Sequence, residues 1–554
     1  MPVALDVLFV IGLSVAFAAQ MLRWMRVLQR EHYEASALAR FVGRWSSPQV
    51  SAVSKAKVRL EQSDKSVRTA PRDEFQGAPR FEQDRLRPKA ERGARRPLTL
   101  SHVLIFAFIA AVVVKNAYVQ IAVAVIYGLF TPWGLSIRGR TGSLVWTRRA
   151  ITTAVLATVV SLGIASIGFV SNRPWLPAAV AVWAVPVTLD FATRVLKPYE
   201  EHRSKRFVDQ AVARLKRVHP RVVAITGSYG KTSTKNHLAQ IMGDDGVVVT
   251  PRSFNNRAGL SRAINENLAD GTRVFVAEMG TYGPGEIRSL CSWCVPEIAV
   301  VTALGPVHLE RMKRLDVIEA AKYEITERAD VVIVNVDDLV LARWPQKLSA
   351  AGKRVRTAGS SNESASVRVG VDGPNWSLVV DGTVIGVGPA ILGVQATNVA
   401  CAVAAALELG VRPEELLDRM ARVRAVENRS NVVTAASGVE VIDDTFNANP
   451  ASAAAALKIL ASMDLTGRRV VVTPGLVELG REQYGENLAL GRKVAFYGAE
   501  LVIVNRTNAV PLAIGYAGPV RRFNVRDEAV TWVKSALVPG DGVLYLNDLP
   551  DHYP

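Results

Sequence analysis

The N-terminal third of the chain alternates between long apolar stretches and basic segments. The apolar stretches are residues 2–22, 98–133, 150–170 and 175–195. Each reaches the roughly 20 residues that a helix needs to cross a bilayer. The stretch 98–133 is too long for one crossing and is interrupted at Lys115-Asn116, which predicts a hairpin of two helices. The pattern therefore predicts about five transmembrane helices, with the first at residues 1–22 and the others within residues 98–195.

Basic residues indicate how these helices are oriented. Residues 23–98 carry 18 Lys and Arg against 9 Asp and Glu, about half of the net charge of +17. Basic loops stay on the cytoplasmic side, which places both residues 23–97 and the loop Arg138–Arg149 inside. After five crossings, residues 196–554 are cytoplasmic as well. We expect a multi-pass protein of the bacterial cytoplasmic membrane, whose basic loop 23–97 lies flexibly near the head groups of anionic membrane lipids.

Composition narrows the class of protein. With 49% hydrophobic and 21% charged residues over 554 positions, the chain is not disordered and is long enough for several domains. Three cysteines are too few for a disulfide framework. Cys291 and Cys294 form one Cys-x2-Cys pair, where a structural zinc needs four ligands, so we expect both in helix packing. No nucleic-acid-binding fold accompanies the basic loop, so we expect no nucleic acid among the partners.

After the last apolar stretch, short apolar runs alternate with helical patterns, which is typical of α/β domains. Arg221–Thr226 is an expected buried strand, and Lys235–Met242 is an expected helix. A strand at Val439–Asp444 with an alanine-rich helix after it begins a further α/β unit. We predict a central P-loop-type ATP-binding domain at residues 196–425 and a Rossmann-like domain at residues 426–554.

A glycine-rich segment joins the first of these strands to its helix. Its glycines let backbone N–H groups face an anion, the Lys231 ammonium reaches the β- and γ-phosphates, and the Thr232 hydroxyl ligates Mg²⁺. Ile225 stands where the strict phosphate-loop pattern has its first glycine. The segment predicts a nucleotide site rather than an ordinary turn. Its residues are Thr226, Gly227, Ser228, Tyr229, Gly230, Lys231, Thr232 and Ser233.

Further polar residues follow the next two strands. Glu278 ends the strand Arg273–Glu278, and His308 follows the strand that begins near Pro296. Each alone would more often be a surface residue. Because ligands gather at the carboxyl ends of parallel strands, their recurrence after a phosphate loop makes both candidates for the site.

Several motifs in a fixed order resemble the ATP-dependent Mur ligase family, over about residues 205–535. They are Thr226–Thr232, Ser253-Phe-Asn-Asn256, Ala277-Glu-Met-Gly280, His308-Leu-Glu310, Ala320-Ala-Lys-Tyr-Glu324, Asp443-Asp-Thr-Phe-Asn-Ala-Asn-Pro450 and Glu478-Leu-Gly480. Within the family, the likeness is strongest to the branch that adds D-alanyl-D-alanine to a UDP-N-acetylmuramoyl tripeptide. An ordered set of motifs is far more specific than one glycine loop.

The resemblance implies a two-step reaction. A substrate carboxylate takes the γ-phosphoryl group of ATP to give an acyl phosphate, and an amine then displaces phosphate to form an amide. Lys231 and Thr232 would hold ATP and a first Mg²⁺ together with Glu278, and His308 would serve a second metal. By the family pattern Lys322 would be carbamylated and act as a metal ligand; the alternative is an ordinary lysine on a helix surface.

The resemblance also implies nucleotide contacts outside the glycine-rich segment. The C-terminal domain would close over ATP and keep water from the acyl phosphate, with Asp444 at the ribose and Arg429 at the γ-phosphate. The implied ATP-binding positions are Asn256, Asn398, Arg429, Asp444 and Asn447.

Four departures from the family pattern bear mostly on the substrate. Membrane helices replace the uridine-nucleotide-binding domain expected before Gly227, and the usual terminal Lys-Gly-Ser is absent. The stretch Gly393–Asn398 lacks the family's histidine, and Asn487 replaces another. The ATP chemistry therefore looks intact, while the identity of the acceptor stays open.

We expect a membrane-anchored, ATP-dependent amide ligase of bacterial cell-wall synthesis that couples D-alanyl-D-alanine to a muramoyl peptide. A lipid-linked or polymeric acceptor, as in the membrane-bound poly-γ-glutamate synthetases, is the alternative, and other cell-wall enzymes are candidate partners. An ATP-driven transporter is disfavoured because no Leu-Ser-Gly-Gly-Gln signature accompanies the loop. A non-catalytic scaffold is disfavoured because the four residues with expected catalytic roles occur together: Lys231, Glu278, His308 and Lys322.

Overall fold

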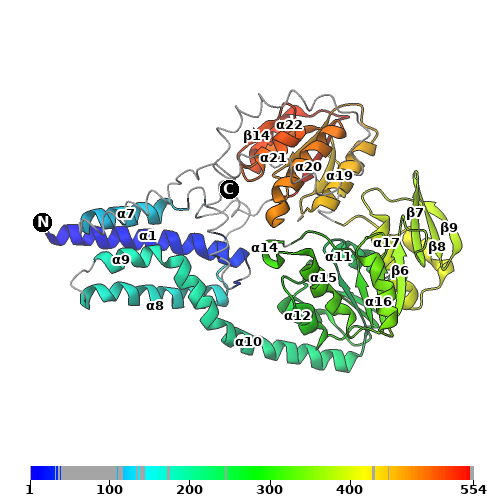
Figure 1. Ribbon diagram of the computed structural model, residues 1–554, viewed down its shortest axis with the longest axis horizontal. Helices are drawn as coiled ribbons and strands as arrows, with labels where there is room; N and C mark the ends of the chain where they lie inside the picture. The colour runs from blue at the N-terminus through cyan, green and yellow to red at the C-terminus, as the bar shows by residue number, and fades with distance from the viewer. Residues whose placement is uncertain are drawn as a thin grey trace. The chain divides into compact units, whose positions relative to one another are not determined.

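The computed structural model describes residues 2–31, 33–34, 38, 41, 109, 117–132, 135, 137, 144–170, 175–243, 246–307, 309–426, 431–446 and 448–548. These residues belong to two compact units, which meet in the sequence between Glu200 and Glu201. The first unit is helical, and the second contains two β-sheets (Figure 1).

The first unit consists of α1 (Pro2–Arg30), α7 (Ala117–Phe130), α8 (Arg148–Val170), α9 (Trp175–Trp183) and the first part of α10 (Val185–Val218). Within the described residues, α1 and α8 are long and apolar enough to cross a membrane. The pair α9 and α10 is a third crossing only if its bend of 67° lies within one span. The structure therefore supports two or three of the five predicted spans. Most of residues 98–116, the first half of the predicted hairpin, lies outside the described residues.

Helices α1 and α7 lie side by side (Figure 1). Two polar side chains of α1 close the end of α7. The Arg23 guanidinium donates to the carbonyl oxygens of Gly128 (2.8 Å) and Leu135 (3.1 Å). Gln20 Nε2 donates to the carbonyl oxygen of Thr131 (2.6 Å). The last carbonyl groups of a helix have no partner within the helix and form the negative end of its dipole. The buried Arg23 is therefore accommodated here, because it donates hydrogen bonds to carbonyl groups at the end of α7 and its positive charge faces the negative end of the helix dipole.

The second unit begins with a mixed nine-stranded sheet, in the order β2-β3-β1-β4-β5-β6-β7-β8-β9. The strands are β1 (Arg221–Thr226), β2 (Val247–Val249), β3 (Val274–Glu278), β4 (Ile298–Val301), β5 (Val331–Asn335), β6 (Arg354–Gly359), β7 (Val367–Asp372), β8 (Asn375–Val380) and β9 (Thr383–Pro389). Strands β1 to β7 pair in parallel, and β8 and β9 are antiparallel additions. The predicted strand at Arg221–Thr226 is confirmed as β1. Its parallel neighbours β3 and β4 end at the same edge of the sheet.

Helices cover both faces of this sheet because both sets of alternating side chains are apolar. Val223 and Ile225 of β1 pack with α11 (Lys231–Met242) and α17 (Ala396–Glu408). The opposite face packs with the end of α10, α12 (Arg257–Asn267), α13 (Glu286–Cys291) and α16 (Trp344–Ala350). Cys291 and Cys294 are buried in this second core, as the sequence predicts.

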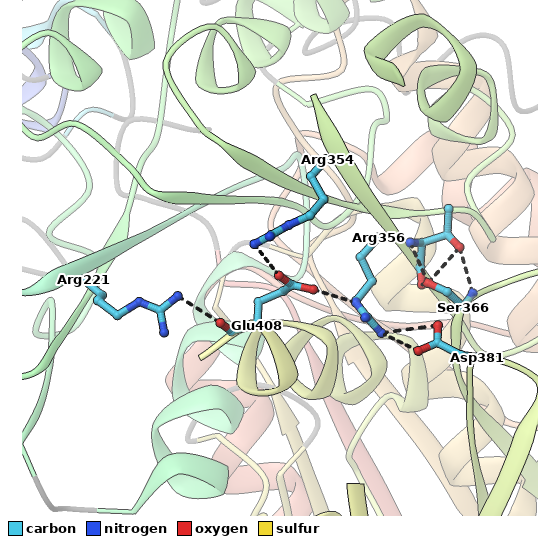
Figure 2. Close-up of polar contacts among 7 residues, drawn as sticks. Arg221, Arg354, Arg356, Ser366, Asp381 and Glu408 are labelled. Atoms are coloured by element: carbon cyan, nitrogen blue, oxygen red, sulfur yellow. Dashed lines mark hydrogen bonds and ion pairs between the residues drawn. The ribbon is translucent and has the colours of Figure 1, made fainter. Parts of the chain in front are cut away.

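An ion network fixes the C-terminal end of α17 to the sheet (Figure 2). Glu408, the last residue of α17, accepts hydrogen bonds from Arg354 Nη2 (2.9 Å) and Arg356 Nε (2.8 Å) of β6. Arg221, at the start of β1, donates to the backbone oxygen of Glu408 (2.9 Å). Because α17 is anchored beside the start of β1, its first turn, which contains Asn398, lies at the edge where β1 ends.

A six-stranded mixed sheet follows, in the order β10-β11-β15-β12-β13-β14. Its strands are β10 (Asn431–Thr434), β11 (Glu440–Asp444), β12 (Arg469–Thr473), β13 (Glu500–Val504), β14 (Arg521–Phe523) and β15 (Gly542–Leu546). Helices α19 (Pro450–Ser462), α20 (Gln483–Phe496) and α21 (Ala509–Tyr516) cover one face, and α22 (Arg526–Ala536) covers the other. The second unit is thus α/β with mixed sheets, as the sequence predicts. Its division into P-loop-type and Rossmann-like domains at residues 196–425 and 426–554 stays a prediction.

Candidate active site

The glycine-rich segment connects β1 to α11 and passes close to two other elements. Gly230 has a φ of 78°, and a Cβ at this position would lie 2.4 Å from Asn398 Oδ1 of α17. A Cβ on Gly227 would lie 2.0 Å from Thr302 Oγ1, in the loop after β4. A side chain at either position would force its neighbours to shift. Both glycines are therefore favoured by the close approach of α17 and of this loop.

Contacts with the neighbouring strands hold the segment in place. Ser228 Oγ donates to the carbonyl oxygen of Gly305 (3.1 Å), and Thr226 Oγ1 donates to that of Met279 (2.8 Å), just after β3. Tyr229 packs over Gly305, where a Cβ would collide with the tyrosine ring. Burial raises the pKa of the Tyr229 hydroxyl, which therefore stays protonated. The segment is tied to both strands that flank β1.

The start of α11 combines a positively charged side chain with the N–H end of a helix. Lys231 Nζ donates to the carbonyl oxygen of Gly227 (2.6 Å), so its ammonium lies against the glycine-rich segment. The first N–H groups of a helix have no partner within it, and they form the positive end of its dipole. Ser233 is half-buried in the same first turn. This arrangement is suited to binding the phosphates of a nucleotide.

Glu278, the last residue of β3, is buried beside α11. Its Oε2 accepts a hydrogen bond from Thr232 Oγ1 (3.0 Å) and pairs with Lys235 Nζ (3.2 Å). Asn255 Nδ2 donates to Oε1 (3.3 Å). Parallel pairing of β3 with β1 brings this carboxylate to the glycine-rich segment. A hydroxyl and a carboxylate oxygen are the hard donors that Mg²⁺ prefers, so this pair of residues fits that ion.

Lys322, on α15 (Leu315–Tyr323), is only 2% exposed. Burial, together with the nearby positive charge of Lys231, lowers the pKa of the Lys322 ammonium well below its ordinary value. The structure therefore brings Lys322 and Lys231 within electrostatic reach, and the alternative of a surface lysine is wrong. His308 immediately precedes α14 (Leu309–Met312) and lies outside the described residues.

The two asparagines expected at the nucleotide have different surroundings. Asn256 is exposed and caps α12, where its Oδ1 accepts a hydrogen bond from Gly259 N (2.9 Å). Asn398 is buried on α17, with its Oδ1 against Gly230. Of these two asparagines, Asn398 alone contacts the glycine-rich segment within the described part of the structure.

In the second sheet, Asp444 is buried at the end of β11. Its neighbour Asp443 accepts hydrogen bonds from Thr445 N (3.1 Å) and Thr445 Oγ1 (2.6 Å), which turn the chain after the strand. Arg429 and Asn447 lie outside the described residues.

Asn487, which stands where the family pattern has a histidine, is buried in α20. Its Oδ1 accepts a hydrogen bond from Leu476 N (2.8 Å), and its Nδ2 donates to Leu476 O (2.9 Å). This side chain therefore holds the loop after β12.

The sequence interpretation missed Lys235 and Asn255. Lys235 follows Lys231 by four residues, so both lie on one face of α11, and this spacing is the signal that points to Lys235. The contact of Asn255 with Glu278 depends on the path of the chain after β2. No local pattern specifies that path.

The chain matches two families of domains and a set of curated ligases. The Mur ligase middle domain matches residues 225–406, and the Mur ligase, glutamate ligase domain matches residues 428–546. The UDP-N-acetylmuramoyl-tripeptide–D-alanyl-D-alanine ligase of Mycobacterium leprae is 32% identical over 364 residues, which cover 58% of this chain and 70% of that protein. The ligase of the same name from Bacillus subtilis is 28% identical over 274 residues, which cover 49% of this chain and 59% of that protein. The chain thus spans less than two thirds of the Bacillus subtilis protein.

Solved structures show the same fold. MurF from Acinetobacter baumannii has a TM-score of 0.54 and 24% identity, over 62% of this chain and 77% of that chain. MurF from Thermotoga maritima, in complex with ADP, has a TM-score of 0.55 and 22% identity, over 62% of this chain and 80% of that chain. Because the two domain matches cover more than half of the 554 residues, and the Mycobacterium leprae relative is matched over 70% of its length, the chain belongs to the Mur ligase family.

Proposed function

We propose that this protein is an ATP-dependent ligase of bacterial cell-wall synthesis, anchored in the cytoplasmic membrane. Members of the Mur ligase family form carbon–nitrogen bonds and use ATP and Mg²⁺. The observation that carries the proposal is the placement of Lys231, Thr232 and Glu278 at the segment between β1 and α11, with the buried Lys322 within electrostatic reach of Lys231. Phosphoryl transfer to a carboxylate needs such cations and oxygen ligands around the γ-phosphoryl group.

In the first step, an oxygen of the acceptor carboxylate would bond to the γ-phosphorus of ATP while the bond from phosphorus to the β–γ bridging oxygen breaks. The products are an acyl phosphate and ADP. Lys231 and backbone N–H groups at the start of α11 would stabilise the charge on the phosphate oxygens. Thr302 and Asn398 hold the segment Gly227–Gly230 from two sides, so the start of α11 is positioned before the nucleotide binds.

In the second step, the amine nitrogen would attack the acyl carbon, phosphate would leave with the electron pair of the broken carbon–oxygen bond, and the nitrogen would lose a proton. Water competes with the amine for the acyl phosphate, so exclusion of water favours the amide. We propose that closure of the C-terminal domain provides this exclusion, with Arg429, Asp444 and Asn447 on the nucleotide. Asn256 and Asn398 would contact the nucleotide from the central domain.

The pair Thr232 and Glu278 would hold Mg²⁺ together with the phosphates, since Mg²⁺ in such sites usually binds through one or two carboxylates and phosphate oxygens. The ion would neutralise charge that develops on the transferred group. His308 and Lys322 would serve a second metal. The lowered pKa of Lys322 favours the neutral amine, which is the form that adds carbon dioxide to give a carbamate with carboxylate-like oxygens.

For the substrates, we propose D-alanyl-D-alanine as the amine and a muramoyl peptide as the acceptor. The curated relatives carry these substrates in their names. A lipid-linked acceptor is the second candidate, with a polymeric acceptor as in poly-γ-glutamate synthetases as a third. One observation favours the lipid-linked form: α10 passes directly into β1, with only His219 and Pro220 between them, so no substrate-binding domain separates the apolar helices from the central domain.

Two observations support the membrane anchor. Helices α1 and α8 are long and apolar enough to cross a bilayer. Large apolar side chains point outward from the helical unit, with Leu162 63% and Val187 68% exposed. Such exposure is costly in water and favourable among acyl chains. With residues 23–97 on the cytoplasmic side, the unit Glu201–Asp548 would be cytoplasmic. Membrane lipids would surround the apolar helices of the first unit.

The test is ADP formation by the detergent-solubilised full chain with one acceptor–amine pair at a time. The pairs are UDP-N-acetylmuramoyl tripeptide with D-alanyl-D-alanine, the lipid-linked tripeptide with the same dipeptide, and glutamate alone. We expect ADP only when both members of a pair are present, with an amide product by mass spectrometry. Lys231→Ala should abolish both, and Lys216→Ala, at an exposed lysine of α10, should leave both unchanged. ADP formation that is independent of every pair would favour the transporter, and no ADP formation would favour the scaffold.

Membrane anchoring is tested separately. In bacterial cells the chain should remain in the membrane fraction after high-salt and alkaline washes, which remove proteins bound only by charge. Recovery in the wash supernatant would contradict the anchor.

A further inference from the structure

Lys235 is a buried cation next to the candidate metal ligand. Its side chain is 1% exposed and that of Glu278 is 2% exposed. Lys235 Nζ donates to the carbonyl oxygens of Thr250 (2.7 Å) and Arg252 (2.6 Å) and to Glu278 Oε2 (3.2 Å). These three acceptors match the three N–H groups of an ammonium. Lys235 therefore acts through Glu278 and the chain after β2, rather than on a substrate.

The position of Glu278 does not depend on Lys235 alone. Thr250 Oγ1 accepts a hydrogen bond from Glu278 N (3.1 Å), Thr232 Oγ1 donates to Glu278 Oε2, and Asn255 Nδ2 donates to Oε1. Removal of the lysine charge would thus leave the carboxylate near its present place. What changes most is the electrostatic potential at that carboxylate, because the ammonium is the cation paired with it in a site with little water.

We infer that Lys235 is a positioning residue that serves as a built-in counter-ion for Glu278, so that this carboxylate binds a divalent cation only when nucleotide phosphates arrive with it. The inference rests on the proposed function, since it concerns the Mg²⁺ that accompanies ATP. An ammonium a few ångströms from a bound dication repels it, which weakens binding of the metal alone. The phosphates of a nucleotide add negative charge that outweighs this repulsion. Metal would then enter with ATP and leave with ADP.

The experiment measures Mn²⁺ binding to the detergent-solubilised full chain without nucleotide, from the electron paramagnetic resonance signal of the free ion. We expect weak binding to the wild type and binding at least about tenfold tighter to Lys235→Gln, which keeps N–H donors and loses the charge. Lys235→Arg, which keeps the charge, should bind as weakly as the wild type. Unfolding or a local structural defect would weaken metal binding, so tighter Mn²⁺ binding cannot result from damage to the fold.

Two further variants locate the effect. In Glu278→Gln/Lys235→Gln the gain should disappear, because the carboxylate that gains attraction is gone. Lys353→Gln is the matched control: Lys353 Nζ also donates to two carbonyl oxygens, of Glu327 (3.1 Å) and Ala329 (2.7 Å), and should not change Mn²⁺ binding. Equal Mn²⁺ affinity in Lys235→Gln and the wild type, or tighter binding in Lys235→Arg as well, would overturn the inference.

The outcome is separable from the proposed function, because no acceptor or turnover enters the measurement. If ADP fails to increase Mn²⁺ binding to the wild type, the nucleotide site itself is refuted. If ADP does so and Lys235→Gln is unchanged, only the role of Lys235 is refuted.

Discussion

Replacement of Gly230 by alanine tests whether the glycine-rich segment binds the nucleotide phosphates. Gly230 precedes α11 with φ 78° and ψ −15°, and an added Cβ would lie 2.4 Å from Asn398 Oδ1 and 3.3 Å from Thr302 Cβ. Ordinary van der Waals contact begins at 3.4 Å. Either the segment or the Asn398 side chain must therefore move by about 1 Å. A shift of the segment weakens the hydrogen bonds from its N–H groups to phosphate, and a shift of Asn398 displaces a side chain that we propose contacts the nucleotide.

The size of the effect follows from the hydrogen bonds that are lost. Each hydrogen bond to a charged group contributes about 1.5–3 kcal/mol. Loss of one or two of them lowers the affinity for ADP by at least about tenfold, because 1.4 kcal/mol corresponds to a factor of ten. The left-handed backbone adds about 1–2 kcal/mol of strain to any residue with a side chain. That strain lowers stability, and it does not by itself change affinity for ADP.

Gly285→Ala is the matched control that separates strain from contact. Gly285 precedes α13 with φ 86° and ψ −16°, and an added Cβ there meets nothing within 4 Å. Calorimetric titration of the full chain with ADP, alongside thermal unfolding, should show both variants destabilised and only Gly230→Ala impaired in binding. If Gly230→Ala binds ADP within about threefold of the wild type, or Gly285→Ala loses as much affinity, the assignment of the phosphate site is refuted.

The remaining predictions concern stability. Between its lowered pKa and the ordinary value of 10.5, Lys322 binds fewer protons in the folded than in the unfolded chain, so the free energy of unfolding should rise with pH. Lys322→Met should remove this rise when denaturation is compared at pH 7 and pH 9 in buffers free of carbon dioxide. An unchanged rise in the variant would contradict the burial of Lys322. Asn487→Ala should cost about 1–3 kcal/mol, because the buried N–H of Leu476 loses its acceptor while the Leu476 oxygen keeps Asn508 Nδ2 as a donor, and a thermal unfolding temperature equal to that of the wild type would refute this. Arg23→Met should lower the thermal stability of the helical unit by about 2 kcal/mol while the affinity for ADP is retained; a loss of ADP affinity would contradict a role confined to the end of α7.

Local patterns were sufficient to predict the elements that carry the site. The apolar run at Arg221–Thr226, its glycine-rich continuation and the polar end of β3 at Glu278 are each legible within a few residues, because strand burial and turn geometry are local. Counting apolar stretches predicted five spans, of which the described residues support two or three. The described α7 has 14 residues, α9 meets α10 at a 67° bend, and most of residues 98–116 lies outside the described part of the chain.

By itself, the sequence determined the α/β class of the second unit, the glycine-rich segment between β1 and α11, and the likeness to the Mur ligase family. Only the tertiary structure decided that Lys322 is buried near Lys231, that Asn255 rather than its neighbour contacts Glu278, and that Lys235 pairs with this carboxylate across 43 residues of sequence. The physical reason is the strand order. Because β1 lies between β3 and β4 in the sheet and all three strands are parallel, residues that are distant in the chain meet at one edge of the sheet. Hydrophobic periodicity specifies each strand, and it does not specify which strands become neighbours.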